Sequence, residues 1–175
     1  MARLSLIVGL PGAGKTTTAK RLAAEQHALR LTPDEWMIPL LGESNPAGKR
    51  AVLEGRLIAL ARQALELGTN VVLDFGFWSR DERSSLRWLA TQHDASCKVI
   101  YLPIGRHEQL ARIGQRQLGA PHTTFVMTES EVDGWREQFE PPDSAELAGL
   151  AIPAPPPGWL DWSAWTADRW PSSDR

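Results

Sequence analysis

One short run near the N-terminus has the composition and spacing of a phosphate-binding loop. Gly9 to Thr16 reads GLPGAGKT, which matches the pattern G-x-x-x-x-G-K-[ST] in full. An apolar run precedes it and a helical pattern follows, which is the context that this loop requires. Its glycines let backbone N–H groups turn toward phosphate oxygens, and the helix N-terminus adds a partial positive charge. The motif therefore predicts that the chain binds ATP.

The side chains of this run suggest how a magnesium nucleotide would be held. Lys15 is expected to reach the β and γ phosphates, and the Thr16 hydroxyl is expected to ligate Mg²⁺. The alternative is a glycine-rich turn that matches the pattern by chance, which the flanking strand and helix patterns disfavour. The predicted nucleotide-binding residues are Gly9, Leu10, Pro11, Gly12, Ala13, Gly14, Lys15, Thr16 and Thr17.

Two aspartates stand where carboxylates could serve phosphoryl transfer. Asp74 follows the apolar run Val71–Leu73, so we expect it at the rim of a sheet, where it would hold Mg²⁺ with Thr16. The alternative for Asp74 is a turn or capping aspartate. Asp34 lies in the first turn of a helix predicted to begin at Pro33, and it is the candidate base for the attacking hydroxyl. Its alternative is an acid favoured there by the helix macrodipole.

Arg112 and Arg116 are a candidate pair of phosphate-binding cations. They lie four residues apart in a predicted helix over 108–118, so they project from the same helix face. Two guanidiniums could bind the transferring phosphate as its charge redistributes. The alternative is an ordinary solvated face. Together with Lys15 and Asp34, these arginines form the predicted catalytic set.

Short apolar runs alternate with helical patterns along the chain, which indicates a parallel sheet flanked by helices. We therefore expect an α/β fold, a doubly wound parallel sheet of the P-loop type with about five strands and a helical lid. Strands are expected at 4–8, 29–31, 70–73 and 97–102. Helices are expected at 15–26, from residue 33, after the loop at 42–48, at 79–92, 108–118 and 128–140.

The composition changes after residue 150. Residues 151–158 (AIPAPPPG) are rich in proline, and Trp159, Trp162, Trp165 and Trp170 follow. Tryptophans bury large apolar areas when they pack, so we expect an ordered arm. The sequence predicts a kinase domain over 1–150 and a Pro/Trp-rich arm over 151–175 that docks on the domain or on a second copy.

Composition limits the partners and the compartment. The net charge of −2 argues against a general nucleic-acid binder, which needs a concentrated cationic surface. The only cysteine, Cys97, lies in an apolar run and is expected to be a buried strand residue. There is no apolar stretch of about 18 residues and no signal-peptide pattern. We therefore expect a cytoplasmic protein without membrane contacts, as a monomer or homodimer.

The ordered set of motifs resembles the small P-loop kinases that include polynucleotide 5′-hydroxyl kinase, zeta toxins and chloramphenicol phosphotransferase. The resemblance covers roughly residues 3–143. It implies that the phosphate-loop strand is central, that Asp34 activates the substrate hydroxyl, and that Arg116 belongs to a mobile lid over ATP. The segments that carry it are 9–16, Thr32-Pro33-Asp34-Glu35, Asn70 to Asp74, Arg80-Asp81-Glu82-Arg83, Arg112 to Arg116 and Phe139-Glu140-Pro141-Pro142.

The leading functional hypothesis is transfer of the γ-phosphate of ATP, with Mg²⁺, to a hydroxyl of a small molecule such as a sugar, nucleoside or antibiotic. One alternative is a kinase for the 5′-hydroxyl of a polynucleotide, which the acidic net charge disfavours. Another is a nucleotide-dependent switch or partner-binding ATPase that has no phosphoryl acceptor.

Overall fold

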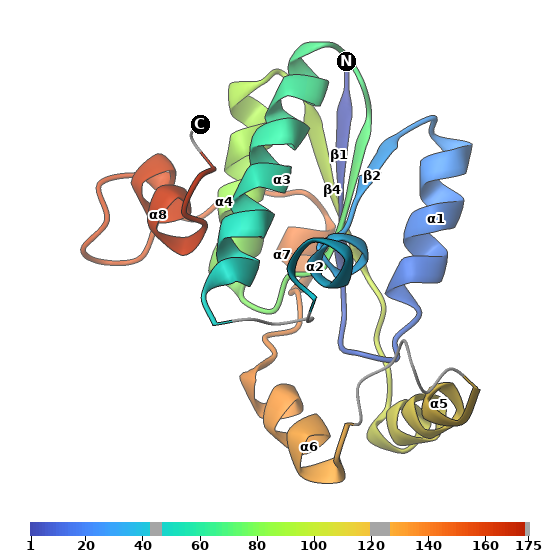
Figure 1. Ribbon diagram of the computed structural model, residues 1–175. Coiled ribbons are helices and arrows are strands. Elements are labelled where there is room, and N and C mark those ends of the chain that lie inside the picture. The colour runs from blue at the N-terminus through green and yellow to red at the C-terminus, as the bar shows by residue number, and fades with distance from the viewer. Residues whose placement is uncertain (43–46, 120–126, 174–175) are drawn as a thin grey trace.

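A parallel sheet with the strand order β2-β3-β1-β4 lies at the centre of the structure (Figure 1). The computed structural model describes residues 1–42, 47–119 and 127–173. The expected α/β fold of the P-loop type is confirmed, although the sheet has four strands within these ranges where about five were expected. The strands are β1 (Arg3–Val8), β2 (Leu29–Leu31), β3 (Val71–Gly76) and β4 (Ser96–Tyr101).

Helices lie on both faces of this sheet and beyond its carboxyl edge (Figure 1). Within the described ranges, none of them is both long and apolar enough to cross a membrane. They are α1 (Lys15–Glu25), α2 (Asp34–Leu41), α3 (Lys49–Glu66), α4 (Arg80–Gln92), α5 (Arg106–Gly119), α6 (Glu129–Gln138), α7 (Ser144–Leu147) and α8 (Trp162–Arg169).

The alternation of side chains along the central strands divides the core into two layers. Successive strand residues point to opposite faces, so Ile7 and Val72 pack with Ala19 of α1, while their neighbours face α3 and α4. Both faces of β1 and β3 are therefore buried, as is typical of parallel sheets covered by helices. The larger layer includes Leu4, Leu6, Val8, Leu57, Ile58, Leu73, Leu86 and Trp170.

The strands end at the edge of the sheet where the phosphate loop begins. Strand β3 runs to Gly76, so Asp74 lies within it, whereas the sequence predicted an end at Leu73. The strand continues because Gly76 pairs with Val8, and because the Gly76 carbonyl accepts a hydrogen bond of 3.2 Å from Gly9 N. This pairing joins the end of β3 directly to the start of the loop.

Local hydrogen bonds set the starts of several helices. Capping boxes at Ser79 and Thr128 start α4 and α6, since each hydroxyl accepts from the backbone three residues on and each Glu returns the bond. Helix α2 begins at Asp34, one residue later than predicted, and the Pro33 carbonyl accepts from Trp36 N and Met37 N at 2.9 Å each. Asp34 therefore occupies the first turn, as expected.

The C-terminal segment, residues 162–173, lies against α3 and α4. Helix α8 packs on α4, and Trp170 is only 1% exposed, with its indole Nε1 donating to Glu54 Oε2 of α3 at 2.9 Å. A Cβ at Gly55 would stand 2.5 Å from the Pro171 carbonyl oxygen, so α3 approaches the segment too closely for any side chain there. The boundary at residue 150 between a domain and an arm stays a prediction.

A fully buried ion pair ties α4 to α7. Arg83 Nε and Nη2 donate to the two carboxylate oxygens of Glu146 at 2.8 and 3.0 Å. The Nη1 group donates to the carbonyls of Phe77 (3.3 Å) and Glu140 (2.8 Å). Arg83 therefore connects the loop after β3 with the segment after α6, and its donors are used inside the fold.

We expect Arg83→Ala to destabilise the fold by about 3–5 kcal/mol, because it would leave the Glu146 carboxylate buried without its partner. Urea unfolding measures this loss. Arg80→Ala is the matched control, since Arg80 lies on the same helix but pairs with Asp143 at a half-exposed position. Similar losses in the two variants would contradict the structural role of Arg83.

Candidate active site

The loop between β1 and α1 has a backbone suited to phosphate. Gly14 is the N-cap of α1 and has φ 87°, a left-handed conformation that a side chain disfavours. A Cβ at Gly9 would stand 2.8 Å from the Leu102 carbonyl oxygen. Lys15 Nζ donates to the Leu10 carbonyl at 3.1 Å, so the side chain lies along the loop. The predicted nucleotide-binding run therefore has the loop-to-helix geometry that its sequence indicates.

The Asp74 carboxylate lies beside this loop and is almost fully buried. It points to the α1 face of the sheet, because it follows Val72 by two residues on β3. The carboxylate accepts hydrogen bonds from the Thr16 hydroxyl and from Arg30 Nη1, the latter at 3.3 Å. Burial raises the pKa of Asp74, against the opposing effects of Lys15 and Arg30, and the negative charge of Asp34 raises it further. Asp74, Lys15, Thr16 and Asp34 are thus brought together.

Thr16 and Asp74 fit the donor set of a nucleotide-bound Mg²⁺. Both offer the hard oxygens that Mg²⁺ prefers, and this ion usually keeps several waters and substrate phosphate oxygens as its other ligands. Two protein ligands are therefore enough. Among residues 1–42, 47–119 and 127–173, no group of three or more His, Cys, Asp or Glu side chains could hold a metal by itself.

Arg30 belongs to the site, and our sequence interpretation missed it. Its guanidinium bridges Asp74 and the Glu35 carboxylate at the start of α2. The sequence did hold a signal, because Arg30 lies between two leucines in a short strand. Its side chain must therefore point to the face opposite to that of the leucines. Arg30 pairs with Val72 in the sheet, so it shares the face of Asp74.

The candidate base, Asp34, is held by a second arginine that the sequence did not indicate. Arg50 Nη1 donates to Asp34 Oδ1 at 2.9 Å, and Arg50 Nε donates to Glu54 Oε1 at 3.0 Å. The Asp34 side chain is 70% exposed, so this contact leaves most of it accessible to solvent. No periodicity relates Arg50 to Asp34, because their contact depends on how α3 approaches α2.

Helix α5 contacts the loop through two side chains. The fully buried Gln109 amide donates to the Pro11 carbonyl at 3.0 Å and accepts from Arg136 Nη1 of α6 at 2.8 Å. Arg112 Nη1 donates to the Gly12 carbonyl at 3.2 Å, and Arg112 pairs with Glu108. The structure therefore brings Arg112 to the loop. Arg116 is part of α5, but its side chain lies outside the described residues.

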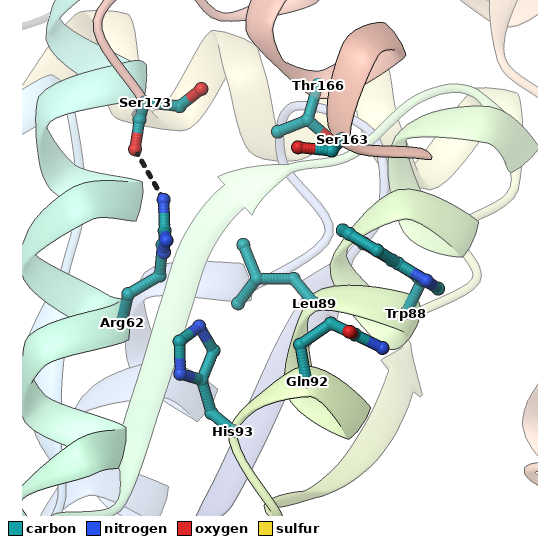
Figure 2. A pocket seen from close by; sticks show the side chains of 8 residues that line it. All are labelled: Arg62, Trp88, Leu89, Gln92, His93, Ser163, Thr166 and Ser173. Atoms are coloured by element: carbon teal, nitrogen blue, oxygen red, sulfur yellow. Dashed lines mark hydrogen bonds between the residues drawn. The ribbon is translucent and has the colours of Figure 1, made fainter. Parts of the chain in front are cut away.

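Two further features lie apart from this site. A cavity of about 60 Å³ lies between α3, α4 and the C-terminal segment. Figure 2 shows the hydrogen bond that Arg62 donates to the Ser173 carbonyl at the edge of this cavity. This volume suits a few water molecules and is too small for a nucleotide. Cys97 lies in β4, as expected, but it is partly buried where a buried residue was expected. Desolvation still raises the pKa of its thiol to about 12, so little thiolate is present at neutral pH.

The parallel sheet, the GLPGAGKT loop and the acid at the end of β3 define a P-loop nucleotide-binding protein. A family model described as "AAA domain" matches residues 4–142, and the chain belongs to this family. None of the curated protein sequences compared with the chain matches it.

Solved structures agree on the fold. A chain of the Pnkp1/Rnl/Hen1 RNA repair complex is 19% identical with a TM-score of 0.68, and the match covers 78% of this chain and 43% of that one. Kti12 of Chaetomium thermophilum, in complex with ADP-AlF3, is 19% identical with a TM-score of 0.58 over 95% of both chains. A sugar kinase from Janibacter sp. is 17% identical with a TM-score of 0.58, over 83% of this chain and 82% of that one. The resemblance to small P-loop kinases is confirmed at the level of the fold. This chain spans less than half of the RNA repair chain.

Replacement of Lys15 by alanine should weaken nucleotide binding about 10- to 100-fold, because it removes a charge-assisted contact to phosphate. Isothermal calorimetry with MgATP measures the change. Lys20→Ala is the control, since Lys20 lies on the same helix and pairs with Glu35 at 3.9 Å. Equal affinities of the Lys15→Ala variant and the wild type would exclude this role of Lys15.

Proposed function

We propose that the protein transfers the γ-phosphate of ATP to a hydroxyl group of a small molecule. The observation that carries this proposal is the position of Asp34 in the first turn of α2, next to Glu35, which Arg30 joins to Asp74 beside the phosphate loop. A carboxylate beside a phosphate loop can accept the proton of a hydroxyl that attacks the terminal phosphate. A nucleotide switch needs no such base.

In the proposed reaction, the loop N–H groups and Lys15 bind the phosphates. Thr16 and Asp74 would hold Mg²⁺, which supplies charge neutralisation at the phosphate oxygens when it is bound. The acceptor hydroxyl forms a bond to the γ phosphorus, the bond to the β–γ bridging oxygen breaks, and ADP leaves. Asp34 accepts the proton that the hydroxyl loses. Arg112 and Arg116 stabilise the negative charge that shifts toward the leaving oxygen.

Charge and fold similarity bear on the class of acceptor. The net charge of −2 favours a small acceptor, and a sugar kinase is among the proteins of similar fold. The fold match to the RNA repair complex supports a second candidate, a polynucleotide 5′-hydroxyl end. Incubation with radiolabelled ATP and separate pools of sugars, nucleosides, antibiotics and 5′-hydroxyl oligonucleotides distinguishes the two. ATP hydrolysis with no labelled acceptor would instead indicate a switch.

Asp34→Asn should lower phosphoryl transfer by roughly 100-fold or more while MgATP affinity stays nearly unchanged, since the amide keeps the shape and cannot accept the proton. Single-turnover transfer and calorimetry measure the two quantities. Asp81→Asn is the control, because Asp81 is an acid in the first turn of α4. Wild-type turnover of the Asp34→Asn variant would reduce Asp34 to a helix-start acid.

Arg116→Ala should depress turnover far more than ATP affinity, because a lid arginine stabilises the transition state more than the ground state. Arginine contacts of this kind contribute roughly 10³- to 10⁵-fold in rate. Lysine should rescue poorly, since it lacks the planar fork. Arg112→Ala and the double variant show whether the two share the role, and Gln115→Ala is the control on the same helix. A loss of affinity alone, or no loss, would refute the lid interpretation.

A further inference from the structure

A continuous path of polar contacts joins the C-terminal segment to the candidate base. The Trp170 indole Nε1 donates to Glu54 Oε2 at 2.9 Å, and the other Glu54 oxygen accepts from Arg50 Nε at 3.0 Å. Arg50 Nη1 then donates to Asp34 Oδ1 at 2.9 Å. These four residues come from the C-terminal segment, α3 and α2. Three contacts therefore span the distance between a buried tryptophan and an exposed carboxylate.

Burial decreases along this path from the core to the surface. Trp170 is 1% exposed and Glu54 is 6% exposed, whereas the Asp34 side chain is largely exposed. The inner end is therefore fixed by packing, including an edge-to-face contact between Trp165 and Trp170 at 5.9 Å. An exposed aspartate at the start of a helix would otherwise sample several rotamers. The path gives its carboxylate one preferred position.

The arrangement also explains why a charged glutamate is kept in the core. Burial raises the pKa of Glu54, while Arg50 and the Trp170 hydrogen bond act in the opposite direction. Together with Arg169 at 4.0 Å, these partners favour the charged form of Glu54 against the effect of burial. Without the tryptophan N–H group, one carboxylate oxygen would lose its donor inside the protein.

We propose that Arg50 is a positioning residue for the Asp34 carboxylate, fixed in place by Glu54 and by Trp170 of the C-terminal segment. This inference rests on the proposed function, because it assigns Asp34 the role of base. The C-terminal segment then acts on the rate of phosphoryl transfer from outside the nucleotide site. A shift of a reacting group by about 1 Å can cost about 100-fold in rate.

The test measures kcat and the KM for ATP in Arg50→Ala, Glu54→Gln and Trp170→Phe. We expect kcat to fall about tenfold or more in each, with the KM for ATP within about twofold of the wild-type value. Arg50→Lys should recover only part of the loss, since one ammonium cannot bond both Glu54 and Asp34 in the way a guanidinium does. Thermal melting confirms that each variant is folded, and Glu54→Gln and Arg50→Ala keep the test valid if Trp170→Phe does not fold.

Ser172→Ala is the matched control. The Ser172 hydroxyl donates to the Val52 carbonyl at 2.9 Å, so this change also removes one hydrogen bond between the segment and α3, but it leaves the path to Asp34 intact. Its kcat should stay within about twofold of the wild-type value. An equal fall of kcat in Ser172→Ala and Trp170→Phe would mean that only the seating of the segment matters, and the proposal would be overturned.

A double-variant cycle separates this proposal from the proposed function. In the Asp34→Asn background, Trp170→Phe should lower the residual rate no further, because its effect passes through Asp34. If Trp170→Phe lowers the residual rate of the Asp34→Asn variant by the same factor as it lowers the rate of the wild type, the proposal is overturned. If the wild type phosphorylates no acceptor, the proposed function is wrong and the catalytic role of Arg50 falls with it. The path itself is then tested by the melting temperatures of the wild type, the two single variants and the double variant. If Asp34 and Trp170 are coupled, the losses of melting temperature in the two single variants do not add up to the loss in the double variant. Strictly additive losses exclude the coupling.

Discussion

The parallel pairing of β1 with β3 is the constraint on which the site depends. It ends with the hydrogen bond from Gly9 N to the Gly76 carbonyl, and it sets the start of the phosphate loop beside the last residue of β3. Asp74 lies two residues before the end of β3, and its carboxylate accepts a hydrogen bond from Thr16. Helices α2 and α5 contribute further side chains to this edge of the sheet.

Opposite charges in close pairs surround this edge. Arg30 is shared by Asp74 and Glu35, Arg50 by Asp34 and Glu54, and Arg112 is paired with Glu108. Each arginine thus has carboxylate partners from the protein itself. Opposite charges at these distances attract one another, so each pair helps to fix the position of its acid. The charged groups at this edge of the sheet are therefore balanced within the protein.

The sequence predicted those features of the site that follow from local patterns. The phosphate loop and the starts of α2, α4 and α6, each within one residue, depend on residues close along the chain. The predicted end of β3 was wrong. The polar Asp74 interrupts the apolar run, and the pairing of Gly76 with Val8 that extends the strand is not a local feature of the sequence. Gln109 and Arg50 could not be predicted, since their contacts with Pro11 and Asp34 require the packing of whole helices.

The state of Cys97 has a practical consequence. It is the only cysteine of the chain, it lies in β4, and its thiol has a pKa of about 12. Alkylating reagents attack the thiolate, so at neutral pH this side chain should react slowly. A cysteine introduced at an exposed position such as Gln115 on α5 would therefore take up a fluorophore or spin label selectively, with the natural thiol left in place. The motions of α5 relative to the sheet become accessible to spectroscopy without first removing a native residue.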